Sequence, residues 1–365
     1  MDEYPETQGL PAVLITAVGS LPHEDAGDAA DLILRSLSSA PHTPQLSRAK
    51  LLEQMWIQFS EGLPRFRVDL DEKSYFFDTS GDASSELERF YSAYLDVSSG
   101  GSPEAFAIGP EYGGGIHSFL QRLQQEGSKK PFIKVQVTGP LSFGLTVTDE
   151  NGKPIFYHPF FRDVVVQSTG LKAAWLVDQF KTFAEEVIVF FDEPSLSAYG
   201  SSAFLGVSRD DVIQSLNEAF ALTLDRGGIP GVHCCGNTDW SILMETATRI
   251  INFDAVDYME TIPLYATQLS QFLARGGALA WGAVPNDERI KGESVDGIRR
   301  RLRDGIELLV KSGVDRALLQ KRLIVTPACG CAGMTVAEAE MTYRLLEALE
   351  NEGGGLFCER NGIIL

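Results

Sequence analysis

Residues 187–194 read VIVFFDEP, a run of five apolar residues that ends in two acids and a proline. Val, Ile and Phe are favoured in strands, and a short, continuous apolar run is typical of a strand that is buried. The polar triplet Asp192-Glu193-Pro194 marks the carboxyl end of that strand. The stretch therefore predicts a buried strand that carries two acidic side chains at its end.

Runs of this kind recur along the chain, and segments with helical periodicity lie between them. The predicted strands cover residues 13–18, 65–70, 132–138, 187–192, 231–235, 250–254, 279–284 and 323–326. The predicted helices cover residues 29–37, 51–59, 87–94, 164–183, 212–224, 298–310 and 336–349. Two helices carry a start signal, because Ser208 with Asp211 and Thr335 with Glu338 have the spacing of a capping box.

Strands that alternate with helices through the whole chain predict the α/β class and a single (β/α)₈ TIM barrel. We expect this barrel to span residues 11–365, after a flexible tail of residues 1–10. The stretch 60–130 is long and rich in Gly and Ser, so we expect insertions near the rim. A doubly wound open sheet is the competing fold. Against it, the first strand ends in Gly19-Ser20-Leu21-Pro22, and no G-x-G-x-x-G motif follows.

The composition limits the partners that this protein can have. Of 365 residues, 50 are acidic and 31 are basic, which gives a net charge of −19. A charge of this sign repels phosphate backbones and anionic membrane surfaces, so neither nucleic acid nor a membrane is an expected partner. No apolar run is long enough to span a bilayer, and the first fifteen residues carry acids where a secretion signal carries Lys or Arg. We expect a cytoplasmic protein, in which grouped cysteines indicate metal binding or catalysis before disulfides.

The reactive side chains follow the predicted strands, and the carboxyl ends of barrel strands meet at one face, where active sites lie. His233 and Cys235 are two residues apart on one strand, so they project to the same side, and Cys234 projects to the other. With Cys329 they offer one nitrogen and two sulfurs, a set that suits tetrahedral Zn²⁺ with one position open. Cys331 is an alternative ligand to Cys329. A purely structural role for these residues is the alternative, because cysteines are often buried without a function and a buried histidine can be satisfied by hydrogen bonds.

Several acids at strand ends are further candidates. Asp192 and Glu193 end a very apolar strand, where a carboxylate needs a cation or hydrogen-bond donors; a substrate ammonium and a cap on the next helix are the two interpretations. Asp254, or Glu260 as its alternative, is a candidate fourth metal ligand. Gly19-Ser20 and Gly139-Pro140 form turns at which backbone groups can approach a small ligand closely.

Taken together, these residues resemble the carboxy-terminal catalytic domain of cobalamin-independent methionine synthase. The similarity runs from Ala17 to the helix after Cys331. Its matching pieces are Val18-Gly19-Ser20-Leu21-Pro22, Thr138-Gly139-Pro140, Asp192-Glu193-Pro194, His233-Cys234-Cys235 and Pro327-Ala328-Cys329-Gly330. The resemblance implies a (β/α)₈ barrel of the kind shared with uroporphyrinogen decarboxylase, and zinc held by His233, Cys235 and Cys329. It also implies contacts to homocysteine from Val18, Ser20 and Asp192.

The resemblance further implies an S-methyltransferase that makes methionine from homocysteine, with the thiol activated on zinc. Three parts of the family pattern are missing. Residues 282–287 contain no histidine, residues 139–148 contain no tryptophan, and the chain is long enough for one barrel where the family has two. Because these parts serve the folate donor, we expect a methylated corrinoid protein as the donor in place of methyltetrahydrofolate.

Two other classes compete with the methyltransferase. A decarboxylase similar to uroporphyrinogen decarboxylase would need a basic pocket, whereas the strand ends here carry acids and thiols. The other is a non-catalytic protein that binds zinc or a corrinoid.

Overall fold

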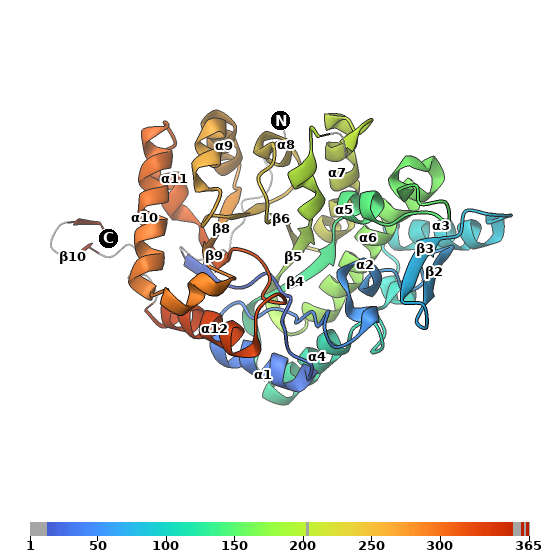
Figure 1. Cartoon of the computed structure of the whole chain (residues 1–365), viewed down its shortest axis with the longest axis horizontal. Helices are drawn as coiled ribbons and strands as arrows, with labels where there is room; N and C mark the ends of the chain where they lie inside the picture. The colour runs from blue at the N-terminus through green and yellow to red at the C-terminus, as the bar shows by residue number, and fades with distance from the viewer. Residues whose placement is uncertain (1–12, 202–203, 353–358, 361–362, 365) are drawn as a thin grey trace.

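A curled parallel sheet with helices on its outer side forms the body of the molecule (Figure 1). The computed structural model describes residues 13–201, 204–352, 359–360 and 363–364, so the predicted tail 1–10 and Cys358 lie outside the described residues. In the described chain the sheet has seven strands, in the order β1-β9-β8-β7-β6-β5-β4. They are β1 (Val13–Ile15), β4 (Lys130–Thr138), β5 (Ala184–Asp192), β6 (Ile229–Cys234), β7 (Ile250–Asp254), β8 (Ala278–Val284) and β9 (Leu323–Pro327). The α/β class and the barrel-like parallel sheet are thus confirmed.

Side chains alternate along each strand between two apolar clusters, and this explains the continuous apolar runs in the sequence. On β5, Ile188 and Phe190 belong to a cluster built almost wholly from strand residues, which fills the inside of the curl. Val189 and Phe191 belong to the large cluster that includes the surrounding helices. Both faces of the sheet are therefore buried, as expected for parallel strands covered by helices.

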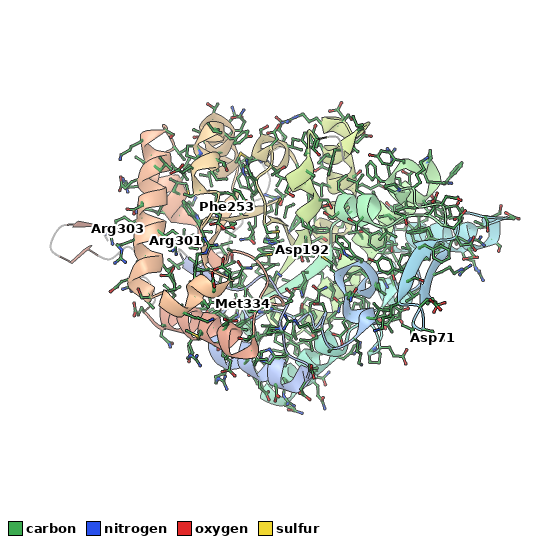
Figure 2. The ribbon with its side chains drawn as sticks, in the orientation of Figure 1. Asp71, Asp192, Phe253, Arg301, Arg303 and Met334 are labelled. Carbon is green, nitrogen blue, oxygen red and sulfur yellow. The ribbon has the colours of Figure 1, made fainter. Side chains whose placement is uncertain are left out.

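The second predicted strand does not join this sheet. Residues 66–69 form β2 (Phe66–Asp69), which pairs antiparallel with β3 (Ser74–Phe77) in a separate hairpin. Figure 2 shows Asp71 in the turn of this hairpin, far from the middle of the molecule. The β2–β3 hairpin and α3 (Ser84–Ser98) belong to the insertion predicted for residues 60–130.

Residues 39–45 take the place that a second barrel strand would occupy. The backbone N–H of Thr43 donates to the carbonyl of Lys134 on β4, at 3.0 Å. On the other side, the N–H of Gln45 donates to the carbonyl of Gly19, at 3.1 Å, just beyond β1. We call residues 39–45 the seam. Pro41 and Pro44 lack an N–H and the seam is polar, so it forms isolated bridges and its sequence does not resemble a strand.

Most of the predicted helices are present, and both capping boxes are confirmed at the starts of α7 (Arg209–Asp225) and α12 (Val336–Asn351). The helices α4 (Gly114–Glu126) and α9 (Ala266–Ala274) were not predicted. The longer helices are α1 (Ala26–Ser36), α3, α4 (Gly114–Glu126), α6 (Pro159–Phe180), α7 (Arg209–Asp225), α9 (Ala266–Ala274), α10 (Val295–Lys311) and α12 (Val336–Asn351). The shorter ones are α2 (Met55–Gln58), α5 (Pro140–Thr146), α8 (Trp240–Glu245) and α11 (Arg316–Lys321). The helix predicted over 51–59 is instead a 3₁₀ turn, η1 (Leu51–Glu53), followed by α2. Among the described residues, no helix is long and apolar enough to cross a membrane.

Candidate metal and substrate site

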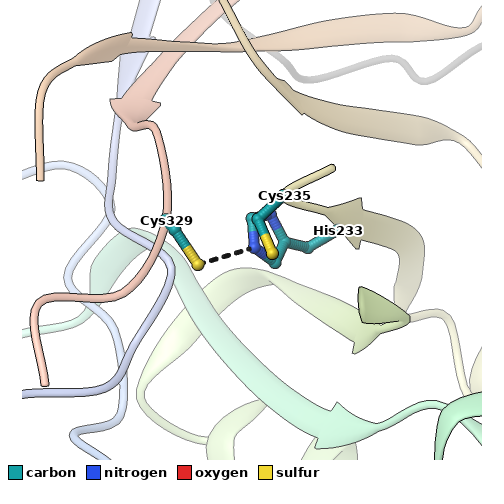
Figure 3. A group of neighbouring side chains, drawn as sticks. All are labelled: His233, Cys235 and Cys329. Carbon is teal, nitrogen blue, oxygen red and sulfur yellow. Dashed lines mark hydrogen bonds between the residues drawn. The ribbon is translucent and has the colours of Figure 1, made fainter. Parts of the chain in front are cut away.

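Three potential metal ligands meet at the carboxyl ends of β6 and β9 (Figure 3). His233 lies on β6, Cys235 follows that strand directly, and Cys329 follows β9. One ligand atom from each residue lies within 4.8 Å of the other two. The structure therefore brings together the three residues that the sequence singled out, although His233 and Cys329 are 96 positions apart.

The spacing of these atoms suits a tetrahedral ion. Cys329 Sγ and His233 Nε2 lie 3.5 Å apart. The usual Zn–S and Zn–N bond lengths at a tetrahedral angle put sulfur and nitrogen about 3.6 Å apart. One imidazole and two thiols form a soft ligand set that prefers zinc to calcium or magnesium. The residues present thus fit a zinc ion with its fourth position open.

Asn252 fixes which nitrogen of His233 faces the two sulfurs. The Asn252 Nδ2 donates to the carbonyl of Ala280 and to Thr326 Oγ1, both at 2.9 Å. Its Oδ1 therefore faces His233 Nδ1, at 2.6 Å, and accepts the proton of that nitrogen. In the neutral ring that a metal requires, the lone pair then lies on Nε2, the atom beside Cys329; without a metal, Nε2 carries a proton when His233 donates to Cys235. This is the arrangement in which an outer partner orients a histidine for a metal.

The two thiols at the site share their negative charge unequally. Hydrogen bonds from Cys329 and His233 lower the pKa of Cys235 to about 4, whereas the bond to Cys235 raises the pKa of Cys329 well above its usual value. Burial would lower the pKa of His233, but Cys235 and Asp192 raise it. The directions of these shifts favour Cys235 over Cys329 as the thiol that ionises first. By contrast, burial raises the pKa of Cys234 and of Cys331 to about 12.

Asp192 lies beside this group, at the end of β5 and in register with His233 on β6. Figure 2 shows it near the middle of the molecule. Its Oδ1 is buried and has no hydrogen-bond partner among the described residues. Burial raises the pKa of Asp192 to about 6, against the opposing effect of Lys134. A buried oxygen without a donor is costly, so this carboxylate suits a ligand that supplies an N–H group.

Glu193 has a different environment from that of Asp192. Its two carboxylate oxygens accept the backbone N–H groups of Leu141, at 2.9 Å, and Ser142, at 2.7 Å. These amides belong to the first turn of α5, whose N-cap residue, Gly139, has no side chain to cap it. Glu193 therefore caps a helix, but this is α5, which precedes it in the chain, and not the next helix as predicted. These contacts leave Asp192 as the acid of this pair with a free oxygen.

Asp254 and Glu260 do not join the three ligands. Asp254 Oδ1 accepts the backbone N–H groups of Val256, at 2.8 Å, and Asp257, at 3.0 Å, so it caps the turn after β7. Glu260 is exposed on a 3₁₀ helix, η6 (Met259–Tyr265). Within the described chain, the group that could hold a metal has three members, and neither of these acids is one of them.

Val18 and Ser20, expected to contact the substrate, lie on a turn between β4 and the Cys329 loop. The carbonyl of Val18 accepts a hydrogen bond from Lys134 Nζ. The carbonyl of Ser20 accepts the N–H of Cys331, at 2.8 Å. A Cβ added to Gly330 would lie 1.9 Å from Ser20 Oγ, so Ser20 packs directly against the residue that follows Cys329.

Two residues of the site were not predicted from the sequence. Asn252 is the polar residue of the strand IINFD, and Lys134 is a charge inside the apolar strand 132–138. Both are fully buried. A polar side chain in the middle of a buried strand is the signal that could have found them, because such a group needs a partner inside the protein.

The fold is a curled parallel sheet covered by helices, and the ends of its strands bring together a group that could hold a metal ion. Neither the family models nor the curated proteins compared with this chain give a match. Among solved structures, the chain is similar to a B12-independent methionine synthase from Shewanella sp. W3-18-1 in complex with selenomethionine. The TM-score is 0.55 at 15% identity, over 94% of this chain and 98% of that one. A methyltransferase from Methanosarcina mazei matches with a TM-score of 0.53 at 12% identity, over 94% and 95% of the two chains. These similarities establish the fold.

Proposed function

We propose that this protein is a zinc-dependent S-methyltransferase that methylates an amino-acid thiol, with homocysteine as the acceptor and methionine as the product. One observation carries the proposal: the His233, Cys235 and Cys329 ligand atoms lie within 4.8 Å of one another, beside the unpartnered oxygen of Asp192. The structural similarity to a methionine synthase and to a second methyltransferase supports the same class of activity.

The residues have separate roles in this reaction. His233, Cys235 and Cys329 hold the zinc ion, and Asn252 keeps Nε2 of His233 directed at it. A bound zinc ion supplies a Lewis acid that lets a thiol in the open position lose its proton near neutral pH. Asp192 binds the ammonium group of the acceptor through Oδ1, and so fixes where the sulfur lies relative to the methyl donor. Transfer then moves the methyl group to the sulfur, and the donor leaves with the bonding electron pair.

The residues of the loop after β8 favour a methyl donor whose leaving group needs no proton. In the loop after β8, Asn286 donates to the carbonyl of Gly330, at 3.2 Å, and residues 282–287 contain no histidine that could act as an acid. A methylcorrinoid meets this condition, because it loses its methyl group as a reduced cobalt species without taking up a proton. Chain length does not distinguish this protein from a methionine synthase, because the chain covers 98% of the methionine synthase structure. The four cysteines that the structure describes are all free, as in proteins of the reducing cytoplasm.

Metal analysis and a product assay test the proposal together. The purified protein should contain about one zinc per chain, and it should form methionine from homocysteine with methylcobalamin or methyltetrahydrofolate. A Cys235→Ser, Cys329→Ser double variant should lose both the zinc and the activity. Cys234→Ser is the matched control, because Cys234 is buried on the helix side of the same strand and its thiol donates to Gly236.

Two results would contradict the proposal in different ways. Full zinc retention in the double variant would remove the metal site. A zinc-containing protein that makes no methionine above the protein-free rate with either donor would leave a zinc-binding protein without this activity.

A further inference from the structure

A buried lysine, Lys134, contacts the backbone turn that lies beside the proposed metal site. Lys134 lies on β4 and is fully buried. Its Nζ donates to the carbonyl of Val18 and, at 3.0 Å, to Gln136 Oε1. It also lies 4.7 Å from the centre of the Phe190 ring. Burial lowers the pKa of Lys134 to about 7, against the opposing effect of Asp192.

Gln136 ties this lysine to the seam. Its Oε1 accepts from Thr43 Oγ1, at 3.2 Å, and its Nε2 donates to the carbonyl of Thr43, at 3.1 Å. The same amide presses against Gly19, where an added Cβ would lie 2.5 Å from Nε2. Gly19 has a φ of +140°, in the region that favours glycine. The backbone of residues 18–20 is therefore supported from below by the side chains of β4.

From this turn the contacts continue to the metal ligand. The carbonyl of Ser20 accepts the N–H of Cys331, and Ser20 Oγ packs against Gly330. The carbonyl of Gly330 also accepts from Asn286. The loop that carries Cys329 thus rests on Ser20 on one side and is bonded to Asn286 on the other.

We infer that Lys134 is a positioning residue, which fixes the Val18–Ser20 turn and, through it, holds the Cys329 sulfur in place for the metal. This inference rests on the proposed function, because it assumes that His233, Cys235 and Cys329 bind zinc. It adds that a side chain on β4, outside the ligand set, governs how tightly the ion is retained. Lys134 supplies no atom to the metal or to the reacting sulfur.

The test is a Lys134→Met variant, which keeps the length of the side chain and removes its charge and donors. Zinc release to an excess of chelator should be about tenfold faster than in the wild type, which is the lower end of the effect of residues that orient metal ligands. With Co²⁺ in place of zinc, the visible absorption bands should shift, because the angle of the Cys329 sulfur changes. Lys172→Met is the matched control. Lys172 is also buried, and it donates to the carbonyls of Glu61, at 2.7 Å, and Ala107, at 3.2 Å.

A general loss of stability would affect both lysine variants, whereas the metal readouts should change in Lys134→Met alone. If Lys134→Met does not fold, Gln136→Met removes one acceptor of the ammonium and its bond to the seam, and it should release zinc faster in the same assay. An unchanged release rate and cobalt spectrum in a folded Lys134→Met or Gln136→Met protein would overturn the inference. A wild type that binds no zinc would instead overturn the proposed function.

Discussion

Asn252 offers the sharpest test of the metal site, because it touches the ligand His233 and lies outside the ligand set. An Asn252→Leu substitution keeps the approximate volume of the side chain and removes its hydrogen bonds to His233 Nδ1, Ala280 and Thr326. The imidazole then loses the acceptor that holds its proton on Nδ1. Loss of such an outer partner weakens metal binding by about 10–100-fold, which corresponds to about 1.4–2.8 kcal/mol.

The same change should destabilise the metal-free protein. The carbonyl of Ala280 and the hydroxyl of Thr326 lose their donor in a fully buried place, and an unsatisfied buried polar group costs about 1–3 kcal/mol. Zinc affinity is measured by competition with a chromophoric chelator, and stability by urea unfolding after the metal has been removed.

Asn217→Leu is the matched control for Asn252→Leu. Asn217 lies on α7, and its side chain accepts the backbone N–H of Ala247, at 2.7 Å. Its loss should lower stability and leave zinc affinity unchanged. Equal zinc affinity in the wild type and in Asn252→Leu would refute the assignment of His233 Nε2 as the metal ligand.

Three further predictions follow from the environments of single residues. In metal-free protein, iodoacetamide should modify Cys235 at a rate that stays constant from pH 8 to pH 5 and falls only as the pH approaches about 4, while Cys234 and Cys331 stay unmodified. The rates are measured by peptide mass spectrometry, and a Cys235 rate that falls tenfold per pH unit below pH 8 would contradict its low pKa. Asp192→Asn should raise the melting temperature of the metal-free protein at pH 7.5 and not at pH 4, because a carboxyl whose pKa is raised in the folded state disfavours folding only above its unfolded pKa. The same variant should have a higher KM for homocysteine, and an unchanged KM would argue against the contact between Asp192 and the substrate ammonium. Asp254→Ala should lower stability by about 0.5–2 kcal/mol without lowering the zinc content, since Asp254 caps a turn; loss of zinc would restore it as a ligand.

The sequence predicted the strands that are buried on both faces, because their apolar runs are continuous. It failed at the second strand of the barrel. The seam contains two prolines and several polar residues, and it forms its bonds only after β4 and the end of β1 have been placed beside it. The amphipathic run at 66–69 belongs to a hairpin in the insertion and reproduced the expected alternation there.

The part of the candidate site that could be predicted consists of residues that directly follow single strands. His233, Cys235 and Cys329 were found because polar and reactive residues stand out after apolar strands. Roles that depend on side-chain direction were not predictable: Glu193 reaches the amides of α5, Asp254 bonds to its own turn, and Asn252 on β7 bonds to His233 on the neighbouring strand β6. A sequence fixes which residues follow a strand, whereas the contacts across the barrel depend on how every strand is placed.

The ligands come from strands made at different times as the chain emerges. His233 and Cys235 are contributed by β6, while Cys329 follows β9, the last strand of the parallel sheet, with β7 and β8 between them. A metal held by all three would bind only after the sheet has been completed. Its presence would then report that folding is finished, and it would tie together parts of the chain that are far apart in sequence, much as a cross-link does.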